Sequence, residues 1–169
     1  TANDEKLNVL YLGGLMEEKG ILEFIAASEH TNEFNFVVCG GGGKGVMEKL
    51  VIAEKNGSLS FRGMTLGIKK AKVFLESDIF IQQTRYPTEG VPLAIIEAMA
   101  AGCAIVTTHH NGIPETVGKA ALFIEKESSE SLLAGLRILK EDREKLAELK
   151  KASIKQSLLY TFEEFELNI

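Results

Sequence analysis

The chain has 169 residues, of which 45% are hydrophobic and 25% are charged, and its formal net charge at pH 7 is −5. This length and composition predict one globular domain with a sizeable core. The acidic balance and the lack of a basic cluster argue against a nucleic-acid partner, and no apolar run reaches the roughly 18 residues of a transmembrane segment.

Strands and helices are predicted to alternate along the chain. In chain order, apolar runs and helical spacing predict a strand at 7–13, a helix at 19–30, a strand at 34–40, a helix at 46–57, a strand at 59–63, a helix at 66–77, a strand at 78–83, a helix at 92–101, a strand at 103–108, a helix at 113–118, a strand at 120–124, and helices at 128–140 and 142–160. Pro92 suits the first helical position, where its missing N–H costs nothing. Continuous apolar strands that alternate with helices predict an α/β fold, a doubly wound parallel sheet of the Rossmann-like kind.

The expected ligand site lies beyond the carboxyl ends of these strands, where such sheets bind their ligands. Ten of the sixteen glycines cluster there, in positions where the backbone turns sharply or approaches a ligand. The segments concerned are 13–14, 40–45, 63–65, 84–90 and 107–112.

The glycine run CGGGGKG (39–45) matches the dinucleotide fingerprint G-x-G-x-x-G through Gly40, Gly42 and Gly45. The match is weak, because a glycine-rich run produces it easily and because it follows the second strand. The acidic residue expected about 20 residues later is also missing; the next strand ends in Phe61-Arg62. An NADP-dependent oxidoreductase, with Arg62 on the 2′-phosphate, stays a minor alternative to a flexible turn or a turn that lines a nucleotide site.

Lys19 is predicted to open the first helix, just past Gly13-Gly14. A lysine there opposes the helix dipole unless an anion is bound, because helix N-termini attract phosphates. A plain surface lysine is the alternative. Its place at the carboxyl end of a strand favours a phosphate ligand.

Glu97 is the one polar residue between Val91 and Ala101, in a helix whose apolar composition predicts burial. Burying an unpaired carboxylate costs several kcal/mol, so Glu97 is expected either to be paired or to face a ligand. A carboxylate can accept hydrogen bonds from both hydroxyls of a ribose diol. Glu89, at the entry of the same helix, could reach a second polyhydroxyl group; a salt bridge or a helix-entry role is the alternative for each.

The cysteines and histidines do not predict a metal site. Cys39 and Cys103 both end apolar runs, so we expect small buried residues, with a disulfide or metal pair as the alternative and the cytoplasm as the location. His109 and His110 are adjacent in an extended segment and point opposite ways. A solvated loop is expected there, and a ligand contact or a metal is the alternative.

The segment EGVPLAIIE (89–97), followed by AMAAGCAIVTT, resembles the retaining nucleotide-sugar glycosyltransferases of the GT-B fold, family 4. Further segments along the chain are similar to motifs of that family: YLGGLMEEKG (11–20), VVCGGGG (37–43), SDIFIQQTRYPTEGVPL (77–93), HNGIPETVG (110–118), with Asn111 in place of a glycine, and YTFEEFE (160–166). The resemblance covers essentially the whole chain.

The resemblance implies a role for each matching position. Glu97 would hold the ribose diol of the donor nucleotide, Glu89 would contact the donor sugar near the reacting carbon, and Lys19 would bind the diphosphate and stabilise the leaving group. The backbone that lines the nucleotide and phosphates would be that of Gly13, Gly14, Arg62, Gly63, Met64, Thr65, Gly90, Val91, Pro92 and Leu93. No metal or other cofactor is implied.

One residue departs from the family pattern. Gly14 stands where the family often carries an arginine that helps the lysine to neutralise the diphosphate, and Arg62 and Arg85 are the candidates to compensate.

The resemblance further implies that residues 1–169 are a single domain, the C-terminal donor-binding half of a larger enzyme, inactive without its N-terminal acceptor half. The parent would transfer a hexose from a UDP- or GDP-sugar to a glycan or lipid-linked acceptor in polysaccharide or surface-glycan assembly. It would be cytoplasmic, and peripheral to the membrane if the acceptor is lipid-linked. A sugar-nucleotide epimerase of the GT-B architecture and a non-catalytic nucleotide-binding module are the alternatives.

Overall fold

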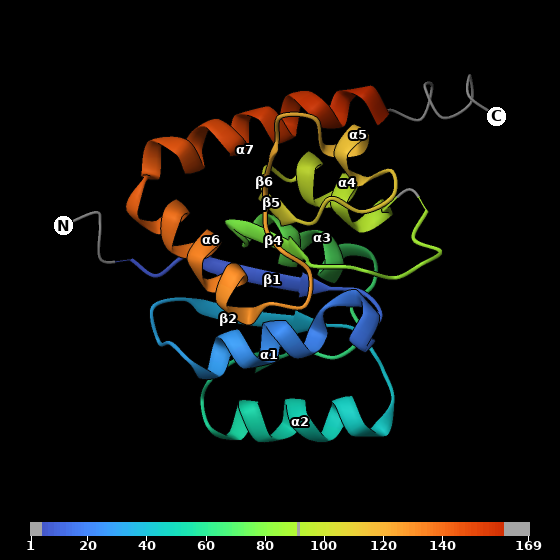
Figure 1. Cartoon of the computed structure of the whole chain (residues 1–169), viewed down its shortest axis with the longest axis vertical. Coiled ribbons are helices and arrows are strands. Elements are labelled where there is room, and N and C mark those ends of the chain that lie inside the picture. The colour runs from blue at the N-terminus through green and yellow to red at the C-terminus, as the bar shows by residue number, and fades with distance from the viewer. Residues whose placement is uncertain (1–4, 91, 161–169) are drawn as a thin grey trace.

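The protein has at its centre a parallel sheet of six strands in the order β3-β2-β1-β4-β5-β6 (Figure 1). The structure is a computed structural model that describes residues 5–90 and 92–160. Its strands are β1 (Asn8–Leu12), β2 (Asn35–Cys39), β3 (Ser60–Phe61), β4 (Ile79–Gln82), β5 (Ala104–Thr107) and β6 (Ala121–Phe123). The order confirms the predicted doubly wound fold, and it reverses direction between β1 and β4.

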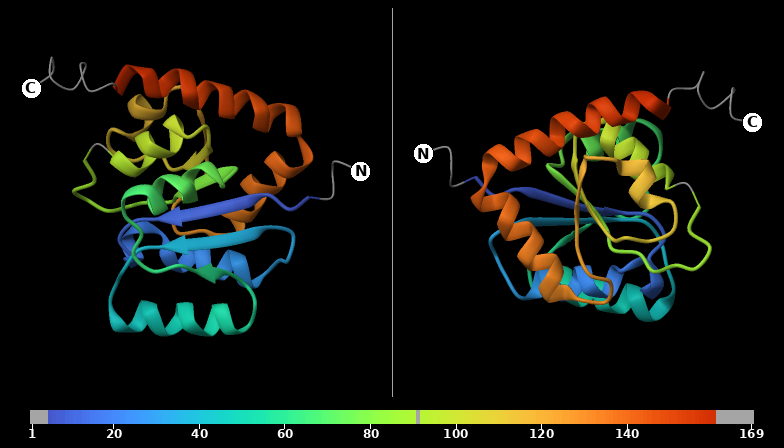
Figure 2. Two further views of the ribbon diagram at one scale, coloured as in Figure 1. Left: turned by 180° about the vertical axis from the view of Figure 1, so that it is seen from behind. Right: turned by 45° about the horizontal axis from the view of Figure 1, so that its top comes forward.

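Helices cover both faces of the sheet (Figures 1 and 2). One face carries α1 (Ile21–Glu29), α2 (Lys44–Lys55) and α6 (Ser129–Glu141), and the other carries α3 (Gly67–Leu75), α4 (Leu93–Ala100) and α5 (Ile113–Val117). The last helix, α7 (Arg143–Ser157), crosses from the first face to the second and packs against α4 and β5. Within the two described ranges, none of the helices combines the length and apolarity that a membrane crossing requires.

Three of the differences between the predicted and the observed boundaries bear on the site or on the edge of the sheet. The expectation that Lys19 opens the first helix is wrong. Lys19 ends a 3-10 turn (Glu17–Lys19), and α1 begins only at Ile21, because Gly20 between them is left-handed with a φ of 84°. Pro92 precedes α4 as its N-cap, with a non-helical ψ of 90°, so the expectation that it occupies the first helical position is wrong. The strand predicted at 59–63 shortens to Ser60–Phe61 at the edge of the sheet.

The two cysteines belong to the core on the α3–α4 face. Cys39 and Cys103 are both fully buried and both free, which confirms the prediction of small buried residues. Burial raises the pKa of the Cys103 thiol to about 12, so this side chain is a neutral core residue at physiological pH.

Candidate functional site

A cleft of about 230 Å³ opens at the carboxyl ends of β1 and β4, between which the strand order reverses. This is the place where doubly wound sheets bind their ligands. The cleft brings together six of the site residues predicted from the sequence: Gly13, Gly14, Lys19, Glu89, Pro92 and Leu93. Tyr11, Leu12, Ile81, Gln82 and Ala94 complete its lining.

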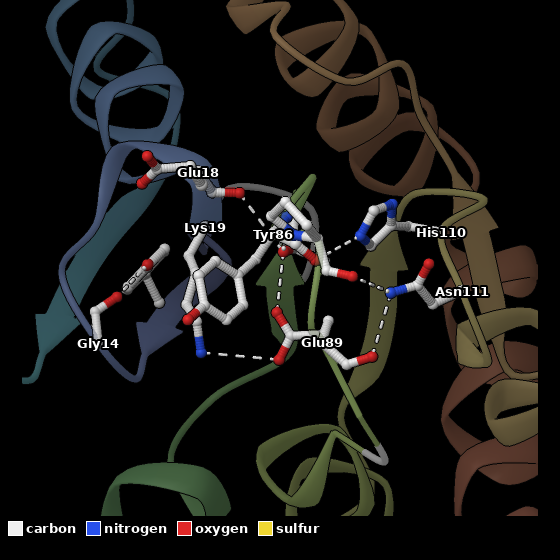
Figure 3. A network of polar contacts seen from close by, with 10 residues as sticks. Gly14, Glu18, Lys19, Tyr86, Glu89, His110 and Asn111 are labelled. Carbon is white, nitrogen blue, oxygen red and sulfur yellow. Dashed lines mark hydrogen bonds and ion pairs between the residues drawn. The ribbon is translucent and has the colours of Figure 1, made fainter.

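Lys19 and Glu89 meet across this cleft (Figure 3). The Lys19 Nζ lies 3.6 Å from the Glu89 Oε1 and 5.1 Å from the centroid of the Tyr86 ring. The two charged side chains are 28% and 10% exposed, so their attraction is less screened than that of a surface pair. The ammonium thus has an anionic and an aromatic neighbour.

Thr84 fixes the other oxygen of the Glu89 carboxylate. The buried Thr84 hydroxyl donates to Glu89 Oε2 over 2.9 Å and accepts from the Tyr86 N–H over 3.0 Å. The N–H of Arg85 donates to the Glu18 carbonyl over 2.8 Å. The loop that carries Glu89 is therefore joined to the turn that carries Lys19.

Tyr11 stabilises the turn at Gly13-Gly14. Its hydroxyl donates to the Gly14 carbonyl over 2.7 Å, and its ring packs edge-on against Phe24. Burial, and then the charges of Glu89 and Glu23, raise the pKa of Tyr11 above its ordinary value. The hydroxyl therefore stays protonated and remains a donor to the turn.

Helix α4 points its N-terminus into the cleft through Pro92, Leu93 and Ala94. The first N–H groups of a helix lack intrahelical acceptors, and the helix dipole places partial positive charge there. Pro92 supplies no side-chain cap. This end of α4 thus presents donors beside the Lys19 ammonium.

Glu97 lies one turn deeper along α4 and does not line the cleft. Its carboxylate is 42% exposed and accepts a hydrogen bond from Lys70 Nζ on α3 over 3.0 Å. The expectation that α4 is buried all round is wrong, because Leu93 is 60% exposed and Glu97 lies on the same open side. The carboxylate is paired, as one sequence alternative had it, and it also remains accessible from outside.

The segment after β3 lies at the same edge of the sheet but outside the cleft. The Gly63 carbonyl accepts from the Gly40 N–H over 2.9 Å, and Met64 is 70% exposed beside Gly41. The backbone of residues 62–65 thus lies beside the glycine run 40–45. Gly90 is exposed next to the cleft, whereas Val91 and residues 161–166 of the last motif lie outside the described residues.

Both candidates to replace the arginine at position 14 have acidic partners outside the cleft. Arg62 pairs with Glu76 at 3.3 Å. Arg85 pairs with Glu23 at 3.5 Å and with Glu127 at 2.8 Å. Lys19 is therefore the one cationic side chain in the cleft lining formed by the described residues.

The glycine run 40–45 allows the loop after β2 to pack closely against the loop after β1. A Cβ at Gly40 would lie 2.0 Å from the Gly13 carbonyl oxygen, and one at Gly42 would lie 2.5 Å from that of Leu15. Both distances exclude any side chain. Two of the three glycines in the fingerprint match therefore have a structural reason that needs no dinucleotide, while Gly45 faces open space in α2.

The loop after β5 supplies contacts that the sequence did not reveal. His109 stacks on Phe123 with ring centroids 3.8 Å apart, whereas His110 turns the other way, onto the Tyr86 carbonyl. Asn111 donates to carbonyls of the Glu89 loop. The adjacent histidines thus point apart, as predicted, and the described part of the chain contains no group of three or more His, Cys, Asp or Glu side chains placed to bind a metal.

An α/β domain whose strand-order reversal holds a cleft with one lysine and a helix N-terminus fits a domain that binds an anionic ligand. Residues 1–156 match the sequence family described as glycosyl transferases group 1, and the chain belongs to this family. It is similar to the amylovoran biosynthesis glycosyltransferase AmsK of Erwinia amylovora, at 31% identity over 125 residues, 67% of this chain and 30% of that protein.

Solved structures share the fold. Sucrose-phosphate synthase from Thermosynechococcus elongatus superposes with a TM-score of 0.82 and 21% identity, over 98% of this chain and 44% of that one. The C-terminal domain of a glycosyl transferase group 1 family protein, LpcC, from Francisella tularensis superposes with a TM-score of 0.74 and 20% identity, over 93% and 87%. The chain spans less than half the length of the curated relatives it matches.

Proposed function

We propose that the chain is the C-terminal, donor-binding half of a retaining GT-B glycosyltransferase of family 4. The parent enzyme transfers a hexose from a UDP- or GDP-sugar to a glycan or lipid-linked acceptor, which its N-terminal half binds. The observation that carries the proposal is the cleft at the strand-order reversal, where Lys19, Glu89 and the N-terminus of α4 converge.

The cleft has the donors that a diphosphate needs. The Lys19 ammonium and the first N–H groups of α4 offer positive charge from two sides, and both would stabilise the charge that develops on a departing nucleoside diphosphate. The Gly13-Gly14 turn leaves room for that group, since a Cβ at Gly13 would meet nothing within 4 Å. Lys19 would thus carry the charge stabilisation that the family often divides between a lysine and an arginine.

The two glutamates differ in their place relative to the cleft. Glu89 lines the cleft with its carboxylate, where it can accept hydrogen bonds from sugar hydroxyls. Glu97 lies further along α4 with an exposed carboxylate that can accept from a ribose diol. One carboxylate thus lines the cleft before α4 and the other is open further along the helix, an order that supports a sugar at Glu89 and a ribose at Glu97.

The relatives support the biological setting. AmsK is named for amylovoran biosynthesis, which favours polysaccharide or surface-glycan assembly for the parent of this chain. The likeness to an isolated C-terminal glycosyltransferase domain supports the placement of the chain in the second half of its enzyme. We expect the chain to bind the donor without transferring the sugar, because the acceptor half is needed for transfer.

Calorimetric titration of the chain with UDP, GDP, ADP and NADP tests this function. We expect saturable binding of UDP or GDP that Glu97→Ala weakens by about tenfold, or about 1.4 kcal/mol, because the ribose loses its acceptor. Glu76→Ala is the matched control, since Glu76 is also half-exposed and paired, with Arg62, away from the cleft. Binding of NADP alone, or equal losses in both variants, would reject the proposal.

A further inference from the structure

The loop that carries Glu89 contains a tight turn at Tyr86–Glu89. The Glu89 N–H donates to the Tyr86 carbonyl over 3.1 Å, and Pro87 occupies the second position, where its fixed φ favours a turn. Pro87 and Thr88 at the tip are exposed. The hydrogen bond within the turn sets its shape, whereas an external anchor can fix its place beside the cleft.

Asn111 provides such an anchor (Figure 3). Its side-chain Nδ2 donates to the carbonyls of Pro87 and Glu89, each over 3.2 Å. Both neighbours are carbonyl oxygens, which only accept hydrogen bonds, so the amide nitrogen must face them. One NH₂ group thus joins two carbonyls of the turn.

The backbone of Asn111 explains why this residue type can stand here. Its φ is 45°, in the left-handed region where Asn is several-fold enriched among residues with a side chain. A glycine would adopt the same conformation without strain, but it would bring no donor. The replacement of the glycine in the family pattern therefore adds an anchor while the loop keeps its backbone.

The neighbours of Asn111 hold the same loop. The Thr108 hydroxyl donates to the Thr84 carbonyl over 2.7 Å. Lys126 Nζ lies 2.9 Å from His110 Nδ1, and since an ammonium only donates, Nδ1 is the acceptor. The proton of the neutral ring is then on Nε2, which donates to the Tyr86 carbonyl over 2.7 Å. The loop after β5 thus contacts the start, middle and end of the Glu89 loop.

We propose that Asn111 is a positioning residue for Glu89: its amide fixes the end of the turn and thereby directs the Glu89 carboxylate toward Lys19 and the cleft. Glu89 is then held at two places. Asn111 binds its backbone carbonyl, and Thr84 binds its carboxylate through Oε2. The effect on donor binding rests on the proposed function, whereas the effect on the turn does not.

Hydrogen exchange of the Glu89 amide tests the anchor in the chain itself. Asn111→Gly keeps the left-handed backbone and removes the donor, so we expect the Glu89 amide to exchange about fivefold faster or more, with little change in the melting temperature. Asn111→Asp turns carboxylate oxygens toward the two carbonyls, and we expect a larger effect. Asn32→Gly, an exposed loop residue at the opposite edge of the sheet, is the matched control.

A binding measurement separates positioning from general loosening. In Asn111→Gly we expect the affinity for UDP-glucose to fall about threefold or more relative to that for UDP, since only the sugar contacts Glu89. Unchanged exchange at Glu89 in both variants, or a wild-type amide that exchanges at the unprotected rate, would overturn the proposal. Wild-type chain that binds none of UDP, GDP and UDP-glucose would reject the proposed function, and the exchange rates would still decide the role of Asn111.

Discussion

Lys19 and Glu89 act on each other before either acts on a ligand. Their charged atoms lie 3.6 Å apart, and the carboxylate is only 10% exposed. A diphosphate bound at Lys19, as proposed, would therefore compete with Glu89 for the same ammonium. The carboxylate that it displaced would then be free to accept hydrogen bonds from the sugar. The two predicted residues thus form one coupled element of the cleft.

Glu89→Gln is expected to tighten the binding of free UDP or GDP. The amide keeps the shape of the side chain and removes the competing charge, so the gain should be about fivefold, or ~1 kcal/mol. Calorimetry with the nucleoside diphosphate measures it. Glu76→Gln, which removes a charge outside the cleft, should change little. Weaker binding by Glu89→Gln would show that Glu89 does not compete for Lys19.

The sequence identified these residues but not how they pair. The place of Lys19 and Glu89 at the carboxyl ends of strands predicts that both belong to the site, and the structure brings both into the cleft. The ion pair of Glu97 with Lys70 joins residues of two helices, and no pattern within either helix predicts it. Asn111 was visible as a departure from a glycine motif, yet its role depends on carbonyls that belong to a different loop.

At the scale of elements, the glycine run 40–45 unites two loops. Gly40 has a φ of 141° and touches the Gly13 carbonyl, whereas Gly45 lies in α2 with open space around its Cα. Alternation of apolar runs predicted the strand and the helix on either side. It could not distinguish a glycine needed for close packing from one that merely fills a helix.

Alanine substitution should therefore have opposite effects at the two ends of this run. Gly40→Ala forces the Gly13 turn to move and should destabilise the protein by about 1–3 kcal/mol. Gly45→Ala removes a poor helix former from an exposed position and should stabilise it by roughly 0.5–1 kcal/mol. Urea unfolding followed by circular dichroism measures both. Equal effects would contradict the view that Gly40 is the point of contact between the loops.

The same limit explains the wrong expectation for α4. Its composition is almost wholly apolar, which predicts burial on all sides. Leu93 and the Glu97 side chain are nonetheless 60% and 42% exposed, so the packing of α4 against α7, β4 and β5 leaves one side of the helix partly open. Composition gives the apolar content of a helix, whereas the solvent exposure of each side depends on which elements pack against it.

At the scale of the molecule, the alternation of strands and helices in the sequence predicts the topology of the sheet. It does not predict the ion pairs between residues that are far apart in the sequence. Glu33, in the loop before β2, pairs with Arg137 at 3.0 Å and with Lys140 at 2.9 Å on α6. More than a hundred positions separate these residues along the chain. The hydrogen bond from Lys140, with those from Thr31 and Arg137, lowers the pKa of Glu33 from 4.5 to about 2.

This lowered pKa predicts how the stability of the protein changes at acidic pH. The folded-state pKa lies below the unfolded one, so the stabilisation by Glu33 is fully present above about pH 4.5 and is lost as the pH falls toward about 2. Wild type should therefore melt at a higher temperature than Glu33→Gln at pH 7. The gap should shrink below about pH 4.5 and close near pH 2. Glu48→Gln, in an exposed pair with Lys44, should show no such gap at any pH. A gap for Glu33→Gln that stayed constant with pH would mean that Glu33 stabilises the protein through neutral hydrogen bonds, because only an ionised carboxylate loses its contribution on protonation.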